Sequence, residues 1–590
     1  MDGLSKPEQI AQRCKDLGYT SCAISDHGSV SGAISFVETC KKKDILPILG
    51  AEMYVATGLA TDQSKESKNL HQVILAKNLE GWHKLIQLVS RSHDDDVFYY
   101  KNRIDLNIME ELCDYNFVSF SGHPGSMLYD IVFRGDEPDL YIDKMWDIFG
   151  KESFFIEIQL VDERSEVKGI MNELRNIGEH FGIKCIATCD AHYATPDQVD
   201  DHRVLLCSSI QTTLKYVQTK IENGEAIGLG GFFRSNRFHI PTVSELLEYG
   251  NTAEEIENTQ IITEMCEDYN IFHKPRLPEY RWTTGRTETE YFKELCREGW
   301  RKRNINEKDN KEEYTKRIQN ELEVIHNASL EGYFLIVQDY VNHAKNQGIL
   351  VGPARGSAAG SSVAYLLNIT CVDPIKYDLI FERFYNAARG ESLPDIDVDF
   401  PIYQRENIIK YIEGKYGEDK VAQMITFGRL MGRGALKETL RVHSACDFPT
   451  MNEITKTLPQ EQEIADQLEA TGETSIIGWT LKYEPKLISN YCTMQDGKYQ
   501  GEYATYFEQA SRLEGTYKSS GKHAAGLVIS PESLSKICPM VRSKQEKKIV
   551  GFDMKDAEKI GLVKFDILGV ALLDKLMGVN NMLQYGKIDV

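Results

Sequence analysis

The heptapeptide Pro394-Asp395-Ile396-Asp397-Val398-Asp399-Phe400 is the most informative stretch of this sequence. Its polar and apolar residues alternate strictly, so an extended strand places the three aspartates on one face and the apolar residues on the other. Three like charges in adjacent positions repel one another unless water screens them or a divalent cation binds between them. Magnesium suits such a group, because it takes one or two carboxylates and completes its shell with water and phosphate oxygens. The alternative is a solvated edge strand whose charges prevent aggregation.

A loop of small residues, Val351–Ser362 (VGPARGSAAGSS), precedes an apolar run that is typical of a helix. Small residues allow backbone N–H groups to approach a ligand, and the N-terminus of a helix favours an anion. The loop therefore indicates a triphosphate site, with Arg355 as a bidentate phosphate donor. It is not a Walker A loop, since no Gly-Lys-Ser/Thr follows. The alternative is a tightly packed helix start that binds no ligand.

A third short segment, Val563–Ile567 (VKFDI), reads as a strand with Lys564 and Asp566 on one face. Beside the aspartates of 394–400, Asp566 would complete a site for two cations about 3.5–4 Å apart, and Lys564 could neutralise a phosphate. Taken alone, such a pair is usually a surface ion pair. The segment gains weight only from the other two motifs.

Composition limits the class of protein. The 590 residues suggest roughly three to five structural units. The net charge of −21 excludes binding of nucleic acid through the overall field, so a polyanion would need local basic groups or divalent cations. The 13 cysteines show no CxxC pair, and no apolar run approaches the ~18 residues of a membrane span. Together with the absence of a signal-peptide pattern, this favours a reducing, cytoplasmic location.

The first two hundred residues alternate amphipathic stretches with short β-rich runs, a pattern typical of a β/α fold. Expected strands lie at 20–25, 45–55, 72–76, 117–121, 154–159 and 183–189. In such folds functional residues collect at the carboxyl ends of the strands. Polar groups occur at several of these ends, in the segments Ser25–Gly28, Gly50–Glu52, Ser121–His123 and Asp190–His192.

Seven motifs in one order closely resemble the C family of bacterial replicative DNA polymerases, the alpha subunits of DNA polymerase III. They are Gly332–Val337 (GYFLIV), the loop at 352–360, Phe381–Phe384 (FERF), Pro394–Phe400, Ile425–Gly428 (ITFG), His523–Gly526 (HAAG) and Gly561–Gly569. The resemblance covers nearly the whole chain.

This resemblance implies a multidomain fold of the α/β and α+β classes. A β/α-barrel-like polymerase-and-histidinol-phosphatase (PHP) domain is expected at 1–270, and a helical connector with the first part of a nucleotidyltransferase-type, polymerase beta-like palm at 271–426. A mostly helical thumb is expected at 427–510, inserted before the second part of the palm at 511–590.

The resemblance also implies site residues for template-directed DNA synthesis by two-metal nucleotidyl transfer from a dNTP to a primer 3′-hydroxyl. Asp395, Asp397 and Asp566 are expected to converge and to hold two Mg²⁺ ions as the catalytic triad. The expected contacts to the incoming triphosphate are Arg355, Gly356, Ser357, Lys564 and Arg389, although the segment around Arg389 looks one residue longer than usual.

For the PHP domain, the resemblance implies a metal cluster that could hold Zn²⁺ or Mn²⁺. The matching ligands are Asp2, His27, Glu52, His71, His123, Asp190 and His192. The family's first His-x-His pair would precede Asp2, so Asp2 is expected to lie on a fraying terminus, and the site to hold one labile ion or none. His83 and His93 are interpreted as surface residues, and Glu157 as an inward strand residue of uncertain role.

The chain ends 24 residues after Asp566, so the family's fingers, clamp-binding segment and C-terminal OB-type domain are expected to be absent from it. Expected partners are primer–template DNA, dNTPs, a C-terminal polymerase chain and replisome subunits, with no membrane, in a bacterial or phage-infected cell. Two alternatives remain open: a PHP-type phosphoesterase or 3′–5′ exonuclease, and a non-catalytic fragment that binds primer–template or partners.

Overall fold

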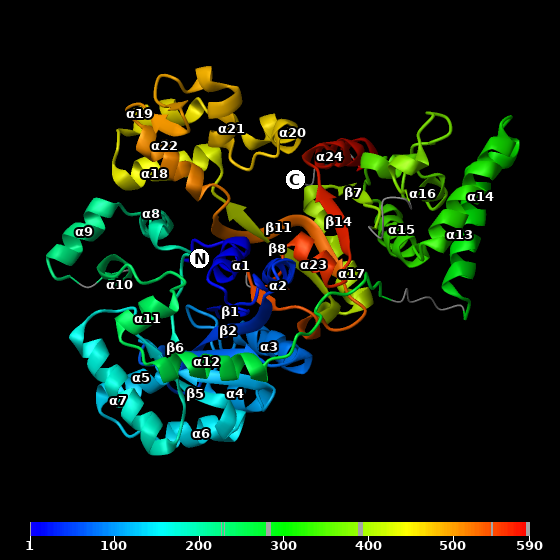
Figure 1. Cartoon of the computed structure of the whole chain (residues 1–590). Helices are drawn as coiled ribbons and strands as arrows, with labels where there is room; N and C mark the ends of the chain where they lie inside the picture. Colours follow the sequence, from blue (N-terminus) through cyan, green and yellow to red (C-terminus); the bar gives the residue numbers. More distant parts are fainter. Residues whose placement is uncertain are drawn as a thin grey trace. The chain divides into compact units, whose positions relative to one another are not determined.

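The chain forms two compact units (Figure 1). The first unit comprises Met1–Asn270 with Phe427–Gly521, and the second comprises Ile271–Thr426 with Lys522–Val590. A computed structural model describes residues 2–225, 227–228, 230–278, 285–386, 393–543 and 547–585. The number of units is smaller than the three to five that length suggests, because the helices of 427–521 share a core with the N-terminal region.

A six-stranded sheet organises the first unit, and its strands follow one another in chain order. They are β1 (Ser21–His27), β2 (Leu46–Ala56), β3 (Asn69–Ala76), β4 (Phe117–Ser121), β5 (Phe154–Gln159) and β6 (Cys185–Thr188). All six expected strands are therefore present. β3 runs antiparallel to both β2 and β4, whereas the other neighbours are parallel. The first residues of β3 consequently lie at the edge where the parallel strands end.

Helices follow most of these strands, and several of them pack on the sheet. They are α1 (Pro7–Asp16), α2 (Ala33–Lys42), α3 (Leu79–Ser92), α4 (Leu106–Leu112), α5 (Met127–Arg134), α6 (Asp139–Phe149), α7 (Ser165–Phe181), α8 (Val199–Ser209), α9 (Leu214–Glu222), α10 (Gly230–Arg234), α11 (Val243–Tyr249) and α12 (Ala253–Met265). Figure 1 shows α12 lying across the sheet, where Ile262 of the helix and Cys266, which follows it, join a buried cluster with Val73, Val118 and Phe155 of the strands.

The segment after residue 426 is mostly helical, as expected. It contains α18 (Gly432–His443), α19 (Phe448–Lys456), α20 (Glu461–Thr471), α21 (Ile476–Tyr483) and α22 (Ala504–Leu513), with a hairpin of β9 (Thr493–Gln495) and β10 (Lys498–Gln500). One apolar core joins Val204 and Leu205 of α8 to Leu436 and Leu440 of α18 and Phe507 of α22. The inserted helices therefore form one folding unit with the N-terminal region.

The second unit is built on a sheet with the strand order β12-β13-β8-β11-β14-β7. Its strands are β7 (Asp397–Phe400), β8 (Val421–Arg429), β11 (Tyr517–Ile529), β12 (Met540–Arg542), β13 (Lys548–Val550) and β14 (Lys564–Gly569). β7 is shorter than the heptapeptide suggests, because regular pairing begins at Asp397. The alternation nevertheless holds, since Ile396, Val398 and Phe400 are buried.

Seven helices of the described residues accompany this second sheet. They are α13 (Glu288–Lys302), α14 (Lys311–Asn327), α15 (Glu331–Asn346), α16 (Ser362–Leu366), α17 (Ile402–Tyr416), α23 (Met554–Lys559) and α24 (Ala571–Tyr585). The expected motif Gly332–Val337 lies in α15, where it is buried, and the ring of Tyr333 packs against Phe565 of β14 at 5.3 Å. The hydroxyl of Tyr333 also accepts a hydrogen bond from the backbone N–H of Ile396 at 3.1 Å. Helix α15 thus contacts both β14 and the residue that precedes β7.

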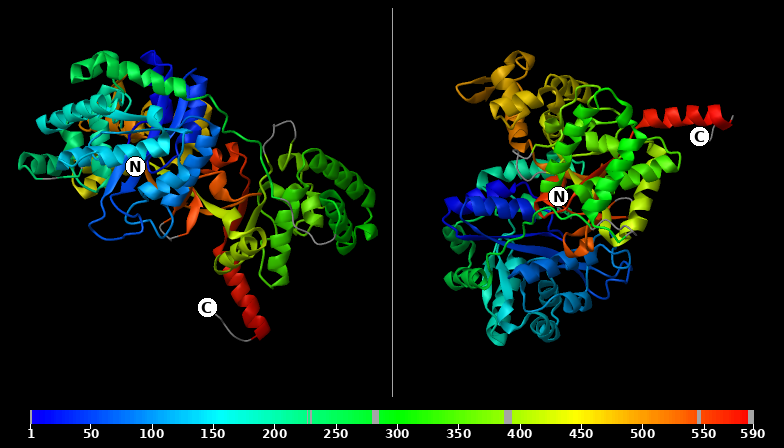
Figure 2. Two further views of the ribbon diagram at one scale, coloured as in Figure 1. Left: turned by 90° about the horizontal axis from the view of Figure 1, so that it is seen from below. Right: turned by 90° about the vertical axis from the view of Figure 1, so that its right-hand side faces the viewer.

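Helix α24 extends away from the rest of the second unit in both views of Figure 2. Leu572, Leu576, Val579 and Leu583 are exposed and recur at intervals of four, three and four residues. This spacing places them on one face of the helix. The helix is therefore amphipathic, with its apolar stripe turned to solvent.

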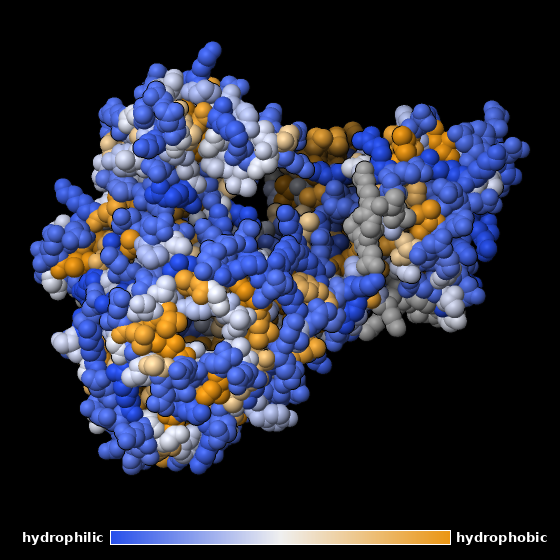
Figure 3. All heavy atoms as spheres, viewed as in Figure 1, coloured by the Kyte–Doolittle hydropathy of each residue, from blue (hydrophilic) through white to orange (hydrophobic). Residues whose placement is uncertain are grey.

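Hydrophilic side chains cover most of the face drawn in Figure 3, and the apolar areas between them are small. Among the described residues, no helix combines the length and the apolar character that a bilayer span requires.

An ion pair with a buried carboxylate and a half-exposed guanidinium joins α8 to α22 and yields a stability prediction. The carboxylate of Asp201, 3% exposed, accepts hydrogen bonds from Arg512 Nε at 2.7 Å and from Gln509 Nε2 at 3.0 Å. Asp201→Asn should lower the free energy of unfolding by about 2 kcal/mol, because an amide N–H₂ would then face a guanidinium donor. Denaturant unfolding of the full chain measures this loss.

The adjacent Asp200 provides the matched control, since its side chain is 79% exposed. Asp200→Asn should change the free energy of unfolding by less than ~0.5 kcal/mol. Equal effects of the two substitutions would contradict the inference that the buried Asp201 carboxylate stabilises the packing of α8 on α22.

Candidate functional site

Three aspartates converge at the edge of the second sheet, as predicted. Carboxylate oxygens of Asp395, Asp397 and Asp566 all lie within 4.8 Å of one another. The parallel pairing of β7 with β14 explains this, because its register sets Asp397 directly beside Asp566. Asp395 lies two residues earlier, on the same face of the chain.

The most buried aspartate retains an unused oxygen. Asp566 is 6% exposed, and its Oδ1 atom makes no hydrogen bond with any described residue. Its other oxygen, Oδ2, lies 2.7 Å from Nζ of Lys564, which also lies 3.7 Å from Asp395 Oδ2. Lys564 is only 11% exposed, so this is not the surface ion pair that was the alternative interpretation. A buried, unpartnered carboxylate oxygen beside two further carboxylates fits a divalent cation.

The pKa values of the group reflect burial and repulsion between its carboxylates. Desolvation, reinforced by the charges of Asp395 and Asp566, raises the pKa of Asp397 to about 6. The pKa of Asp395 is also raised, by burial and by Asp566. The neighbouring carboxylates in turn raise the pKa of Lys564, although burial alone would lower it. The group therefore carries more negative than positive charge, and a bound cation would balance the excess.

The loop of small residues lies directly against the acidic strand. The backbone N–H of Gly352 donates to the carbonyl of Asp399 at 2.9 Å, and a Cβ at Gly352 would lie 2.8 Å from that of Asp399. Gly356 adopts φ +58°, and a Cβ there would lie 3.6 Å from Asp397 Oδ2. The loop therefore brings its exposed residues, Gly356 and Ser357, to the edge where the aspartates converge.

The cation of this loop is paired with the acidic strand. Arg355 Nη1 lies 3.1 Å from Asp399 Oδ1, and Arg355 Nε lies 4.0 Å from Asp397 Oδ2. The Arg355 side chain is 48% exposed, so a phosphate could reach it. The remaining predicted nucleotide contact, Arg389, lies outside the described residues.

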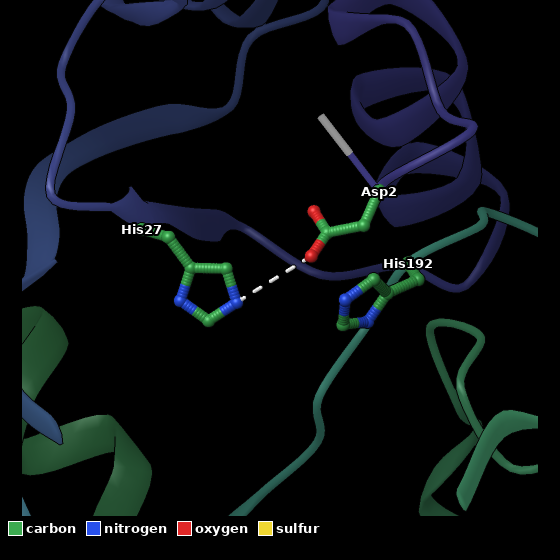
Figure 4. A group of neighbouring side chains, drawn as sticks. All are labelled: Asp2, His27 and His192. Carbon is green, nitrogen blue, oxygen red and sulfur yellow. Dashed lines mark ion pairs between the residues drawn. The ribbon is translucent and has the colours of Figure 1, made fainter. Parts of the chain in front are cut away.

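A second group of predicted ligands lies at the edge of the first sheet. Ligand atoms of Asp2, His27 and His192 lie within 4.8 Å of one another, as do those of His27, Glu52 and His71. Figure 4 shows the side chains of Asp2 and His192 on one side of His27, whose Nε2 lies 3.8 Å from Asp2 Oδ2. The antiparallel β3 explains the position of His71, because it carries this residue at its start rather than at its end.

Glu52 is the centre of this second cluster. Its carboxylate lies 2.5 Å from His71 Nδ1, 3.0 Å from His123 Nε2 and 3.2 Å from His27 Nδ1. Although burial alone would raise it, the three imidazoles hold the pKa of Glu52 well below its ordinary value. His27 Nδ1 and His123 Nε2 are buried and face this carboxylate, so the imidazoles and Glu52 form one group of polar atoms that could share a cation.

The two other predicted ligands contact these groups without belonging to them. His123 reaches the cluster through Glu52, and Asp190 lies 3.3 Å from His192 Nδ1. Of the two histidines interpreted as surface residues, His83 is exposed and His93 is half-buried.

The expected fraying of Asp2 is wrong. The carbonyl of Asp2 accepts a hydrogen bond from His202 Nε2 at 2.7 Å, and the backbone N–H of Leu4 donates to the carbonyl of His192 at 2.7 Å. Leu4 is itself buried, at 5% exposure. These contacts restrain the first residues against α8 and the segment after β6.

Sequence reasoning missed the supporting roles of two residues. Glu157, 1% exposed on β5, lies 2.5 Å from His123 Nδ1 and accepts from the hydroxyl of Thr188 at 3.0 Å, so it orients the imidazole. Its signal was a carboxylate inside an otherwise apolar strand. His202, which holds Asp2, lies within a helix and gave no comparable signal.

Comparison with known proteins agrees with the resemblance. Residues 290–569 match the family described as the bacterial DNA polymerase III alpha NTPase domain, and residues 1–160 match the PHP domain. DNA polymerase III subunit alpha of Aquifex aeolicus is 32% identical over 98% of this chain and 50% of the relative. The subunit of Campylobacter jejuni is 32% identical over 99% and 48%, and that of Helicobacter pylori 33% identical over 97% and 48%. The chain spans about half the length of these curated relatives.

The raised pKa of Asp397 predicts a pH-dependent stability. An acid with an ordinary pKa of 3.8 and a folded-state pKa of about 6 loses stability as pH rises through this window, because the folded state holds the proton more tightly. Without metal, Asp397→Asn should therefore stabilise the protein at pH 7.5 by about 1 kcal/mol, a value reduced for the side chain's contact with water. The gain should vanish near pH 4. Calorimetry in the presence of a chelator measures it.

Magnesium should make the unsubstituted chain more stable than Asp397→Asn, which is the reverse of the order expected without metal. It should raise the melting temperature of the unsubstituted chain, whereas Asp397→Asn should respond weakly because it lacks one ligand. Asp419→Asn, at an exposed aspartate of the same unit, is the control and should behave like the unsubstituted chain. A gain for Asp397→Asn that persists unchanged at pH 4 would contradict the assigned repulsion.

Proposed function

We propose that this chain, which belongs to the family of bacterial DNA polymerase III alpha subunits, catalyses template-directed DNA synthesis by nucleotidyl transfer from a dNTP to a primer 3′-hydroxyl. The single observation that carries this proposal is the convergence of Asp395, Asp397 and Asp566 around an unpartnered carboxylate oxygen. The proposed partners are primer–template DNA, dNTPs, a C-terminal polymerase chain and replisome subunits.

The proposed roles follow from charge and placement. Two Mg²⁺ ions held by the three aspartates would lower the pKa of the primer 3′-hydroxyl and neutralise the triphosphate. Asp397 and Asp566 face each other across β7 and β14, so both would hold the cations. The ammonium group of Lys564, which lies at the carboxylates, can turn toward a phosphate oxygen and pair with it. Sequence choice would come from pairing with the template, since phosphate contacts only position the duplex.

The loop would bind the triphosphate. Arg355 can exchange Asp399 for a phosphate, which its guanidinium binds in a bidentate manner. Gly356 and Ser357, exposed beside Asp397, would supply backbone and hydroxyl donors. Arg389 remains a predicted contact.

We assign residues 1–270 to the PHP domain and 271–426 to the connector and the first part of the palm. Residues 427–510 would be the thumb, and 511–590 the second part of the palm. In this assignment the thumb packs on the PHP domain through α8, α18 and α22.

Metal-dependent incorporation of a dNTP into a primer–template tests the main proposal. The chain is assayed alone and with the C-terminal half of a relative such as the Aquifex aeolicus subunit. Asp395→Asn and Asp566→Asn should each reduce incorporation at least ~1,000-fold, because each removes a charged ligand from the transition state. Asp419→Asn, at an exposed position, should retain activity. Undiminished incorporation by Asp566→Asn would overturn the proposal.

A second candidate function belongs to the first sheet, where the clustered imidazoles and carboxylates favour a Zn²⁺- or Mn²⁺-dependent phosphoesterase or 3′–5′ exonuclease. His27 is shared by both groups of ligands, and a neutral imidazole has one lone pair for a metal. We therefore expect one labile ion or none, and negligible hydrolysis. Retention of two or more metals per chain after dialysis against a mild chelator, with 3′-end hydrolysis abolished by His192→Ala, would contradict this expectation.

A further inference from the structure

The proposed phosphate loop is fixed at its start by the strand that carries the aspartates. The N–H of Gly352 donates to the carbonyl of Asp399, and the residue after it, Pro353, accepts from the N–H of Cys371 at 2.6 Å. The absence of a side chain at Gly352 is required, because a Cβ there would collide with Asp399. The first end of the loop is thus set by β7.

The other end of the loop is fixed by a buried carboxylate on α14. Glu321 is 0% exposed, and its Oε2 accepts from the hydroxyl of Ser361 and from the N–H of Val363, both at 3.0 Å. Its Oε1 accepts from the N–H of Ser362, also at 3.0 Å. The hydroxyl of Ser361 in turn accepts from the N–H of Ala364 at 3.1 Å. Both carboxylate oxygens are therefore used to orient the peptide groups that follow the loop.

An arginine one turn earlier on α14 completes the connection. Arg317 Nε donates to Glu321 Oε1 at 2.7 Å, and Arg317 Nη2 donates to the carbonyls of Gly360 at 2.8 Å and Leu379 at 3.0 Å. Gly360 is the last residue of the 3₁₀ turn Gly356–Gly360, and a Cβ there would lie 2.6 Å from the carbonyl oxygen of Ile380. Two side chains of one helix thus hold the loop's final turn against the segment that follows Leu379.

This arrangement exceeds what the short helix α16 needs. Ser361 alone can cap a helix start, and a surface cap would avoid the cost of burying a carboxylate. The additional donors to Glu321 fix the loop relative to α14 instead. Between the two fixed ends lie Arg355, Gly356 and Ser357, which are exposed.

We propose that Glu321, with Arg317, is a positioning residue for the incoming triphosphate. These two side chains hold the loop so that the loop's donors face the phosphates, and they contact no phosphate themselves. This inference rests on the proposed function, because it assigns the loop the same ligand. Fixing the donors in advance removes an ordering penalty from nucleotide binding. It leaves the three aspartates and their cations untouched.

Glu321→Gln tests the proposal in the full chain with a primer–template and its C-terminal complement. An amide N–H₂ would replace one carboxylate oxygen and oppose a backbone N–H, so the loop end should reorient. We expect KM for the dNTP to rise about tenfold, with kcat within about threefold and the magnesium dependence unchanged. Glu323→Gln, an exposed carboxylate two residues along the same helix, is the matched control and should leave KM unchanged.

A smaller substitution guards against loss of folding. Ser361→Ala removes only one hydroxyl from the network, and we expect KM to rise about threefold in a chain that melts as a single folded species. If Glu321→Gln does not fold, Ser361→Ala decides: an unchanged KM overturns the positioning role, and a raised KM supports it.

The outcomes separate this inference from the function on which it rests. An unsubstituted chain that incorporates dNTPs, with a folded Glu321→Gln variant of unchanged KM, overturns the positioning role alone. A variant whose kcat falls with KM constant overturns it as well, because the defect then lies in the chemical step. Failure of the unsubstituted assembly to bind or incorporate any dNTP refutes the proposed function and the positioning role together.

Discussion

Repulsion among three carboxylates is the constraint on which the second unit depends. The register of β7 against β14 forces Asp397 and Asp566 into adjacent positions, and the rest of the site accommodates the resulting field. Lys564 lies against Asp566, and Arg355 lies against Asp399, so the two cations surround the acidic strand without neutralising all of it. The apolar faces of the same strands pack on α15, which keeps the charged edges in place despite their repulsion. The repulsion in such a site is unfavourable, and a bound cation would relieve it.

Backbone contacts decide where the loop of small residues, the proposed phosphate site, lies. Gly352 has no side chain to keep it from Asp399, and the carbonyl of Gly360 is held by Arg317. A loop fixed at both ends has few conformations to lose when it binds a ligand. The residues between the fixed ends can therefore be small and exposed without being disordered.

Alternation, spacing and strand order made much of this molecule predictable. The strict alternation of 394–400 gave the shared face of the aspartates, but it could not show which of them converge with Asp566. The register supplies that answer, since Asp399 lies beside Leu568, beyond Asp566. His71 escaped the rule that functional residues follow parallel strands, because β3 runs in the opposite direction. Glu321 was unpredictable for another reason: a carboxylate on a charged helix looks solvated until the fold buries it.

The shared core of the first unit has a consequence for synthesis of the chain. Leu205 of α8 packs in the same cluster as Leu513 of α22, although 308 residues separate them. At about 5–20 residues per second, a ribosome takes roughly 15–60 s to cover that distance. During this interval the apolar face of α8 has no helical partner from the later segment. Until the later helices are synthesised, this part of the core of the nascent N-terminal region is therefore exposed to water unless a chaperone covers it.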